Sequence, residues 1–363
     1  MKGARIPLTG RFGIEEEFTL LDARTLVPVS AEGVHAAVLG DVEGGGRLSA
    51  EFMTSQVEAA TDPVGSLAQA REQLGRMRRM LAEHAPEGTV VAATGAPFAL
   101  AGAGRVTPTP HYDDVSQLIG RLASEHTVNG LHVHVEVTGD EERVRALLRL
   151  REALPLLLAL SANSPFAFGV PAGLASWRST LIRRLPVSWG PPIFTDADHY
   201  RRTVDRLVGI GLLPARSSVS WAVRLSEQYD TVETRVADAQ LEVEDTLLLA
   251  ALTRAIVLAD DVVPTSSAPD DLDASLWLAA RHGMQARFCI ADGGSESAWA
   301  AAKRVLAGIR PVLDELGDAE FVDDRLAYLR AEGTGAERQL RAHASGGVEG
   351  LAELFDAPSQ PLA

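Results

Sequence analysis

Three acidic side chains in a row, Glu15, Glu16 and Glu17, interrupt the apolar segment FGIEEEF near the start of the chain. Burying ionised carboxylates is costly unless cations or hydrogen bonds compensate them. If the segment is a strand, Glu15 and Glu17 project from one face and Glu16 from the other. Glu15 and Glu17 then belong either to a charged outer face or to a cluster that binds metal ions. For Glu16 we expect a structural or a solvent-facing role.

Two further segments carry acids and histidines in strand-like patterns. AEFMTSQVEAAT adds Glu51 and Glu58, which enlarge the acidic cluster unless both are solvated surface groups. In GLHVHVEV, His132 and His134 share one face, and the valines share the other face, which favours a core. Two histidines in this pattern are a frequent metal-ligand arrangement, although a polar sheet face with hydrogen-bonded histidines would look the same.

The segment TVETR places Glu233 and Arg235 on one strand face. They form either a surface ion pair of little energetic value, or a metal ligand next to an arginine that neutralises a phosphate group. Further arginines surround the irregular region after residue 162, and among them we favour Arg178 for a functional role.

Oxygen-rich ligands accompanied by a histidine suit Mg²⁺ or Mn²⁺ better than a structural zinc ion. The chain has no Walker-type loop, and no GxGxxG motif follows a strand. If a nucleotide binds, metal ions held by carboxylates must therefore hold its phosphates.

The elements that position these residues follow from hydrophobic periodicity and turn signals. Strands are expected within residues 10–30 (two, around a turn), 47–61, 89–98, 130–137 and 231–239. Helices are expected from Asp62-Pro63 to Gly88, at 139–161, at 196–210 and, with breaks at 264–271 and 292–297, from Glu242 onward. Residues 163–195 are expected to form an extended surface loop.

Strands and helices do not alternate as regular βαβ units, so we predict an α+β fold with a curved, mainly antiparallel sheet flanked by helices. One domain is expected over residues 1–363, sheet-rich at 10–240 and helical at 241–363.

The composition excludes several classes of function. With 34 basic and 49 acidic residues, the net charge of −15 argues against nonspecific binding to nucleic acid or to an anionic membrane. No apolar stretch has the length of a membrane span. Cys289 is the only cysteine, and no signal-peptide pattern is present, so we expect a cytoplasmic protein.

The motifs GIEEEF, SAEFMTSQVEAAT, NGLHVHVEV, LSANSPFAFG, ASWR and TVETRVAD resemble, in this order, those of the glutamate–cysteine ligase type 2 family. The resemblance covers roughly residues 10–310, and the length favours the compact YbdK-like carboxylate–amine ligases. It implies a fold similar to the glutamine synthetase catalytic domain. It also implies an ATP-dependent ligase that phosphorylates a carboxylate and lets an amine attack the acyl phosphate, as in γ-glutamyl bond formation.

Carried over by motif, the resemblance assigns a metal-binding role to Glu15, Glu17, Glu51, Glu58, His132 and Glu233. Arg235 resembles the arginine that meets the transferred phosphate, and Arg178 one that holds substrate. His132, Glu233 and Arg235 are accordingly expected to hold ATP with Mg²⁺ or Mn²⁺. The partners expected are a small-molecule carboxylate and an amine, with a dimer or larger assembly suggested by analogy.

Departures from the family pattern occur at 95–102, at 170–173, at Ala222 and at Asn129. Those at 95–102 and 170–173 motivate an alternative, a non-catalytic or divergent nucleotide-binding paralogue with an altered amino-acid pocket. A second alternative is a metal-dependent hydrolase with His132 and His134 as zinc ligands.

Overall fold

The computed structural model describes residues 10–259, 268–290 and 293–356. An eight-stranded sheet lies at its centre, with the order β2-β3-β4-β1-β6-β10-β9 and with β5 paired to β1. Its strands are β1 Phe12–Asp22, β2 Gly40–Asp41, β3 Arg47–Ala50, β4 Gln56–Ala60, β5 Thr89–Ala92, β6 Gly130–Glu136, β9 Val223–Leu225 and β10 Thr231–Asp238. Neighbouring strands pair antiparallel, as the sequence predicts.

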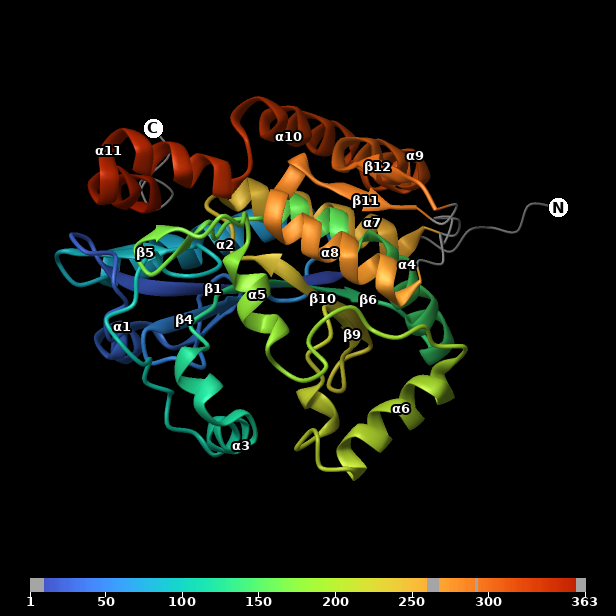
Figure 1. The fold of residues 1–363 in the computed structure, drawn as a ribbon, viewed down its shortest axis with the longest axis horizontal. Coiled ribbons are helices and arrows are strands. Elements are labelled where there is room, and N and C mark those ends of the chain that lie inside the picture. The colour runs from blue at the N-terminus through green and yellow to red at the C-terminus, as the bar shows by residue number, and fades with distance from the viewer. Residues whose placement is uncertain (1–9, 260–267, 291–292, 357–363) are drawn as a thin grey trace.

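Helices cover one face of this sheet in two layers (Figure 1). The inner helices are α2 Leu67–His84, α4 Asp140–Ser161, α7 Val243–Leu258 and α8 Pro269–His282. The outer helices are α9 Ala298–Leu316, α10 Ala319–Glu332 and α11 Gly335–Asp356, which is kinked at Gly347. One large apolar cluster joins the sheet to both layers.

The other face of the sheet is flanked by α3 Pro110–Ile119 and α6 Ala197–Gly209, which stand apart from each other (Figure 1). The remaining elements include the short helices α1 Glu32–Val38 and α5 Trp177–Arg183 and the hairpins β7 Phe166–Ala167 with β8 Val170–Pro171 and β11 Arg287–Cys289 with β12 Ser295–Ser297. Short 3-10 helices lie at Gly120–Glu125, Arg216–Ser218 and Gly283–Gln285. Among the helices of the described ranges, none combines the length and the apolar character that crossing a bilayer requires.

Alternation along the strands separates the two faces. Ile14, Val133, Val135 and Val232 are buried beneath the helices. Because side chains directly opposite each other across paired strands share a face, the register fixes which polar groups meet on the other side. Glu15 lies opposite His132, and Glu17 opposite Glu58.

Several sequence-based boundaries are wrong. Helix α2 begins at Leu67 rather than at Asp62, because Val64 still pairs with Phe12 and Ser66 caps the helix by accepting a hydrogen bond from the Gln69 amide. The expected second strand after residue 25 is only a bridge between Leu21 and Pro28.

The segment 163–195 is not one extended surface loop. It contains the β7–β8 hairpin and α5, and Asn163, Ser164, Ser176 and Arg178 are buried within it. Helices α1 and α3 were not predicted. The expected break at 264–271 falls largely outside the described residues.

Glu16 is fully buried on the helix-facing side of β1. Arg78 of α2 donates to both of its carboxylate oxygens, at 3.0 Å from Nε and 2.6 Å from Nη2, and Thr246 of α7 donates to it as well. Arg78 also donates to the backbone carbonyls of Gln240 and Leu241. The structural role expected for Glu16 is confirmed, and the solvent-facing alternative is wrong.

Replacing Arg78 by Met should leave the Glu16 carboxylate buried without its counter-charge. Breaking a buried pair from one side costs about 3–5 kcal/mol of unfolding free energy. Urea unfolding measures this loss. The matched control is Arg79→Met at the exposed neighbouring position, and an equal loss in both variants would contradict the role given to the pair.

Candidate active site

The acids and histidines meet on the sheet face that the inner helices leave uncovered. Glu15 and Glu17 of β1, Glu58 of β4, His132 and His134 of β6 and Glu233 of β10 all project from this face, because the register pairs Glu15 with His132, Glu17 with Glu58 and Glu233 with His134. Glu51 follows β3 directly. The strand parity predicted for these residues is confirmed.

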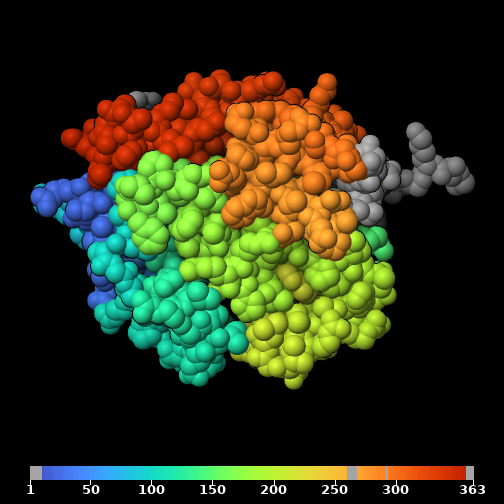
Figure 2. Space-filling view, in the orientation of Figure 1, coloured from blue at the N-terminus to red at the C-terminus, as the bar shows by residue number. Residues whose placement is uncertain are grey.

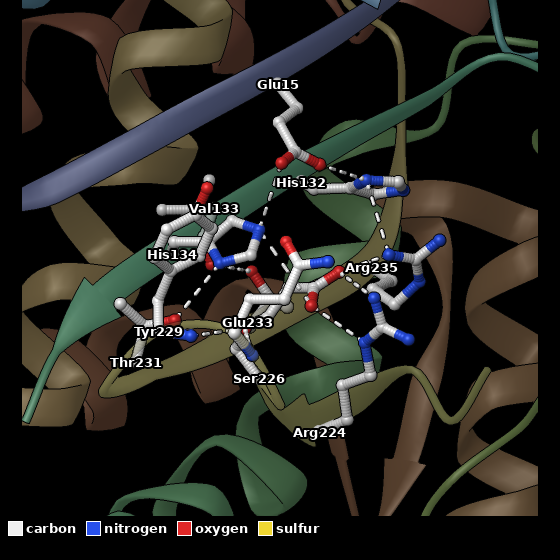
Figure 3. A network of polar contacts seen from close by, with 12 residues as sticks. Glu15, His132, Val133, His134, Arg224, Ser226, Tyr229, Thr231, Glu233 and Arg235 are labelled. Atoms are coloured by element: carbon white, nitrogen blue, oxygen red, sulfur yellow. Dashed lines mark hydrogen bonds and ion pairs between the residues drawn. The ribbon is translucent and has the colours of Figure 1, made fainter. Parts of the chain in front are cut away.

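Both histidines of β6 contact Glu15 (Figure 3). His132 Nδ1 lies 3.0 Å from Glu15 Oε2, and His134 Nε2 lies 3.3 Å from Glu15 Oε1. Burial acts to raise the pKa of Glu15, but the two imidazoles outweigh it and hold this pKa well below its ordinary value. Burial and the nearby charge of Arg235 lower the pKa of His132, which favours the neutral ring that metal ions bind.

Glu233 is fully buried between two arginines. Arg224 of β9 donates to it from Nε at 2.7 Å, and Arg235 pairs with its other oxygen (Figure 3). Burial opposes ionisation of Glu233, yet Arg235 and Arg224 lower its pKa. The surface ion pair considered for Glu233 and Arg235 is therefore wrong, because the carboxylate has no contact with solvent.

Glu17, Glu51 and Glu58 form a second cluster, in which one oxygen of each lies within 4.8 Å of the others. Gly130 N–H donates to Glu17 at 2.5 Å, Ser49 to Glu58 at 3.1 Å, and Tyr112 to Glu51 at 3.3 Å. Burial and the charge of Glu17 raise the pKa of Glu51 to about 8. Burial and three neighbouring glutamates raise the pKa of Glu58 well above its ordinary value.

These donor sets fit a hard divalent cation. Three groups bring their ligand atoms within 4.8 Å: Glu15, Glu58 and His132; Glu15, His134 and Glu233; and Glu17, Glu51 and Glu58. Every group contains at least two carboxylates, and burial together with neighbouring glutamates raises the pKa values of Glu51 and Glu58, an effect that a bound cation would counter. Within the described chain no such group contains both histidines, which disfavours the two-histidine zinc site of the hydrolase alternative.

Arg178, near the start of α5, is buried beside this face. Its guanidinium donates to the carbonyls of Arg235 and Val236, and its Nε has no hydrogen-bond partner among the residues that the structure describes. Gly130 makes this approach feasible, since a Cβ there would come within 2.6 Å of Arg178 Nη2. An arginine with an unused buried donor is suited to a carboxylate or phosphate ligand.

A cavity of about 280 Å³ opens onto the site between α3 and the segment that follows α5. Glu17, Glu51, His132, Arg178 and Arg235 line it. In Figure 2 the surface is hollowed between the teal segment around α3 and the yellow-green segment across from it. Glu15, Glu58 and Glu233, also predicted as site residues, lie beside these groups but do not line the cavity.

Sequence reasoning missed several residues that line this cavity, among them Tyr112 and His126. A signal for the first was present, since Thr109 and Pro110 form the N-cap and first turn of α3. Nothing in the sequence around His126 distinguishes it, because it follows a short 3-10 turn outside any periodic segment.

The family model described as glutamate-cysteine ligase family 2 (GCS2) matches residues 11–354. A relative from Saccharopolyspora erythraea, provisionally named a glutamate–cysteine ligase 2-2, is 37% identical over 96% of this chain and 92% of its own length. The chain belongs to this family. The resemblance drawn from the motifs is thus confirmed, and so is the expectation of a ligase.

Solved structures agree on the fold. The glutamate–cysteine ligase of Francisella tularensis, solved in complex with AMP, superposes with a TM-score of 0.72 at 14% identity, over 97% of this chain and 88% of that one. A bifunctional glutathione synthetase from Pasteurella multocida gives a TM-score of 0.70 at 17% identity over 96% of this chain, which spans about half (52%) of that protein. The predicted α+β ligase fold is confirmed.

The departures from the family pattern lie outside the acid and histidine clusters. Ala222 is buried, and its carbonyl accepts a hydrogen bond from the Arg235 amide at 2.8 Å. Asn129 is buried as well, and its side chain accepts hydrogen bonds from Thr19 and Gln56. Both residues therefore have structural partners beneath the site.

Without metal, the protein should lose stability as the pH rises from about 4.5 to about 8. Over this range the unfolded chain has already released the Glu51 proton, whereas the folded protein still binds it. Glu51→Gln should flatten this dependence, and added Mg²⁺ should restore stability at pH 8 by compensating the cluster. Thermal unfolding with EDTA or Mg²⁺ measures both effects. Glu43→Gln, at an exposed position, serves as the control, and a Glu51→Gln profile identical to that of the unaltered protein would contradict the expectation.

Proposed function

We propose that this protein is an ATP-dependent carboxylate–amine ligase that forms an amide bond through an acyl phosphate. The observation that carries the proposal is the register of β4, β1, β6 and β10, which gathers carboxylates, histidines and Arg235 on one open face in a member of a ligase family. Phosphoryl transfer depends mainly on positioning and on neutralising charge, and this face offers groups for both.

Glu15, Glu17, Glu51, Glu58, His132 and Glu233 are the residues that we propose hold Mg²⁺ or Mn²⁺. Bound there, such ions would neutralise phosphate charge in the way that metal-dependent phosphoryl transfer requires. His132, in its neutral form, offers a ring nitrogen, while Glu15 and Glu233 stay ionised because their pKa values are lowered. That the relative from F. tularensis was solved with AMP supports nucleotide binding on this fold.

The arginines have separate proposed roles. Arg235 lies beside His132 and Glu233, where it can meet the transferred phosphate. Arg178, whose Nε is buried without a partner among the described residues, would hold the carboxylate substrate. Both arginines line the cavity, so a substrate bound between them would cover part of an acyl phosphate from water.

The non-catalytic paralogue is the second candidate. The departures at 95–102 and 170–173 motivate it, and Asn129 and Ala222 give it less support because their partners are structural. Three expectations stay predictions: the single domain, the homodimer and the cytoplasmic location, which was inferred partly from the lone cysteine, Cys289.

Mixing the protein with ATP, Mg²⁺ and a panel of amino acids should release ADP. A coupled ADP assay and detection of the amide by mass spectrometry measure turnover. ATP binding without ADP release on any substrate pair would favour the non-catalytic paralogue, and absence of nucleotide binding in calorimetry would overturn the ligase proposal.

Strand parity predicts that substituting neighbouring glutamates affects turnover unequally. Glu15→Gln and Glu17→Gln should abolish turnover, because each removes a carboxylate from the open face. Glu16→Gln should destabilise the protein but largely retain turnover per folded molecule, because Glu16 contacts Arg78 on the opposite face. ADP release, normalised to the folded fraction from circular dichroism, tests this, and equal loss of turnover in all three variants would refute the parity argument.

A further inference from the structure

The cavity beside the candidate active site is chemically divided. The arginines that line it, Arg178, Arg224 and Arg235, come from α5, β9 and β10. The α3 wall contributes no arginine among the described residues and lies next to Glu51, whose carboxylate accepts a hydrogen bond from Tyr112. A carboxylate substrate would therefore be drawn to the arginine side, which leaves the α3 side for the other substrate.

The α3 wall is mainly apolar, although His111 at the start of the helix lines the cavity too. Tyr112, Val115 and Ile119 recur on one helix face and line the cavity, and each stays partly exposed although the helix packs through this face. They rest on a small apolar cluster around Phe52 that is separate from the main core, and α3 itself has no fully buried residue. The exposed apolar area faces the cavity and would be covered by an apolar ligand group.

The opposite wall adds apolar side chains beside its arginines. Ile182 and Leu185 line the cavity at the end of α5 and just after it, and Leu213 and Val219 line it beyond α6. Ile182 and Leu185 are also only partly buried. Two apolar walls that face each other across a gap bind an apolar group by removing both surfaces from water, at about 25 cal/mol per Å².

His126 also lines the cavity on the α3 side. Its ring packs edge-on against Phe52, with ring centroids 5.7 Å apart, and Tyr112 packs on the same phenyl ring at 5.2 Å. His126 Nδ1 is buried and makes no hydrogen bond to a described residue. Burial and the charges of Arg178, Arg184 and Arg235 lower the pKa of His126 to about 4, so the ring is neutral at physiological pH and adds no charge to this wall.

We propose that the α3 side of the cavity, made by Phe52, Tyr112, Val115, Ile119 and His126, selects an acceptor amine that carries a bulky branched or aromatic side chain. The inference rests on the proposed ligase function and names the class of its amine substrate. A small amine, such as cysteine or alanine, would leave much of both apolar walls in contact with water.

The first test compares amines of different size. With ATP, Mg²⁺ and a fixed panel of carboxylates, kcat/KM for L-leucine or L-phenylalanine should exceed that for L-alanine and L-cysteine at least about tenfold, the discrimination expected for one or more methylenes in an apolar pocket. Equal or better turnover of the small amines would overturn the inference while leaving the ligase proposal intact. A size preference confined to the carboxylate substrate would overturn it too.

Variants of the wall locate the effect. Val115→Ala and Ile119→Ala should each raise KM for the bulky amine about tenfold while KM for ATP and kcat stay unchanged. Since α3 contributes no fully buried residue, the truncations should not unfold the core, and an unchanged melting temperature checks this. Leu340→Ala removes a partly exposed leucine on α11 and serves as the control.

Binding is measured apart from turnover. Calorimetry is done with L-phenylalanine and L-alanine in the presence of a non-hydrolysable ATP analogue and Mg²⁺. Phenylalanine should bind at least about tenfold more tightly than alanine, and Ile119→Ala should remove this preference. A retained binding preference without ADP release would count against the ligase proposal alone. Equal binding of the two amino acids would overturn the proposed amine site.

Discussion

Strand register is the constraint on which the candidate site depends. The antiparallel pairing of β1 with β4 and β6 sets Glu15 opposite His132 and Glu17 opposite Glu58. A slip of one residue would turn each of these side chains toward the helices and bring buried Ile14 to the open face. The apolar face therefore enforces the geometry of the polar face, because only one register satisfies both.

Glu16, the central glutamate of the β1 triplet, helps to stabilise this arrangement from the helix-covered face of the sheet. Glu16 and Arg78 compensate each other within the helix-covered layer, and further donors and acceptors from α7 and the residues before it complete their hydrogen bonds. Polar contacts of this kind fix the position of β1 relative to α2 and α7. Glu15 and Glu17 thus project from a strand whose opposite face is fixed by these contacts.

Charge on the open face is compensated unevenly. Glu15 and Glu233 are matched by imidazoles and guanidinium groups, which lower their pKa values, whereas burial and neighbouring glutamates raise the pKa values of Glu51 and Glu58. The acids toward β3 and β4 therefore favour their protonated forms unless a cation compensates them. This end of the site adjoins α3, which packs on a small satellite cluster rather than on the main core, and elements with few buried contacts are those that open most readily.

The sequence by itself determined which acids and histidines share a strand face, and it determined the fold class. Alternation in FGIEEEF, GLHVHVEV and TVETR is a local property of extended backbone, so it holds wherever those strands pair. Only the tertiary structure decided that Glu16 meets Arg78, that Glu233 lies buried between Arg224 and Arg235, and that α3 forms a wall of the cavity with Tyr112 and His126. The Glu16–Arg78 contact joins residues 62 positions apart in the chain. The burial of Glu233 and the position of α3 arise from packing, which the local pattern of apolar and polar residues does not encode.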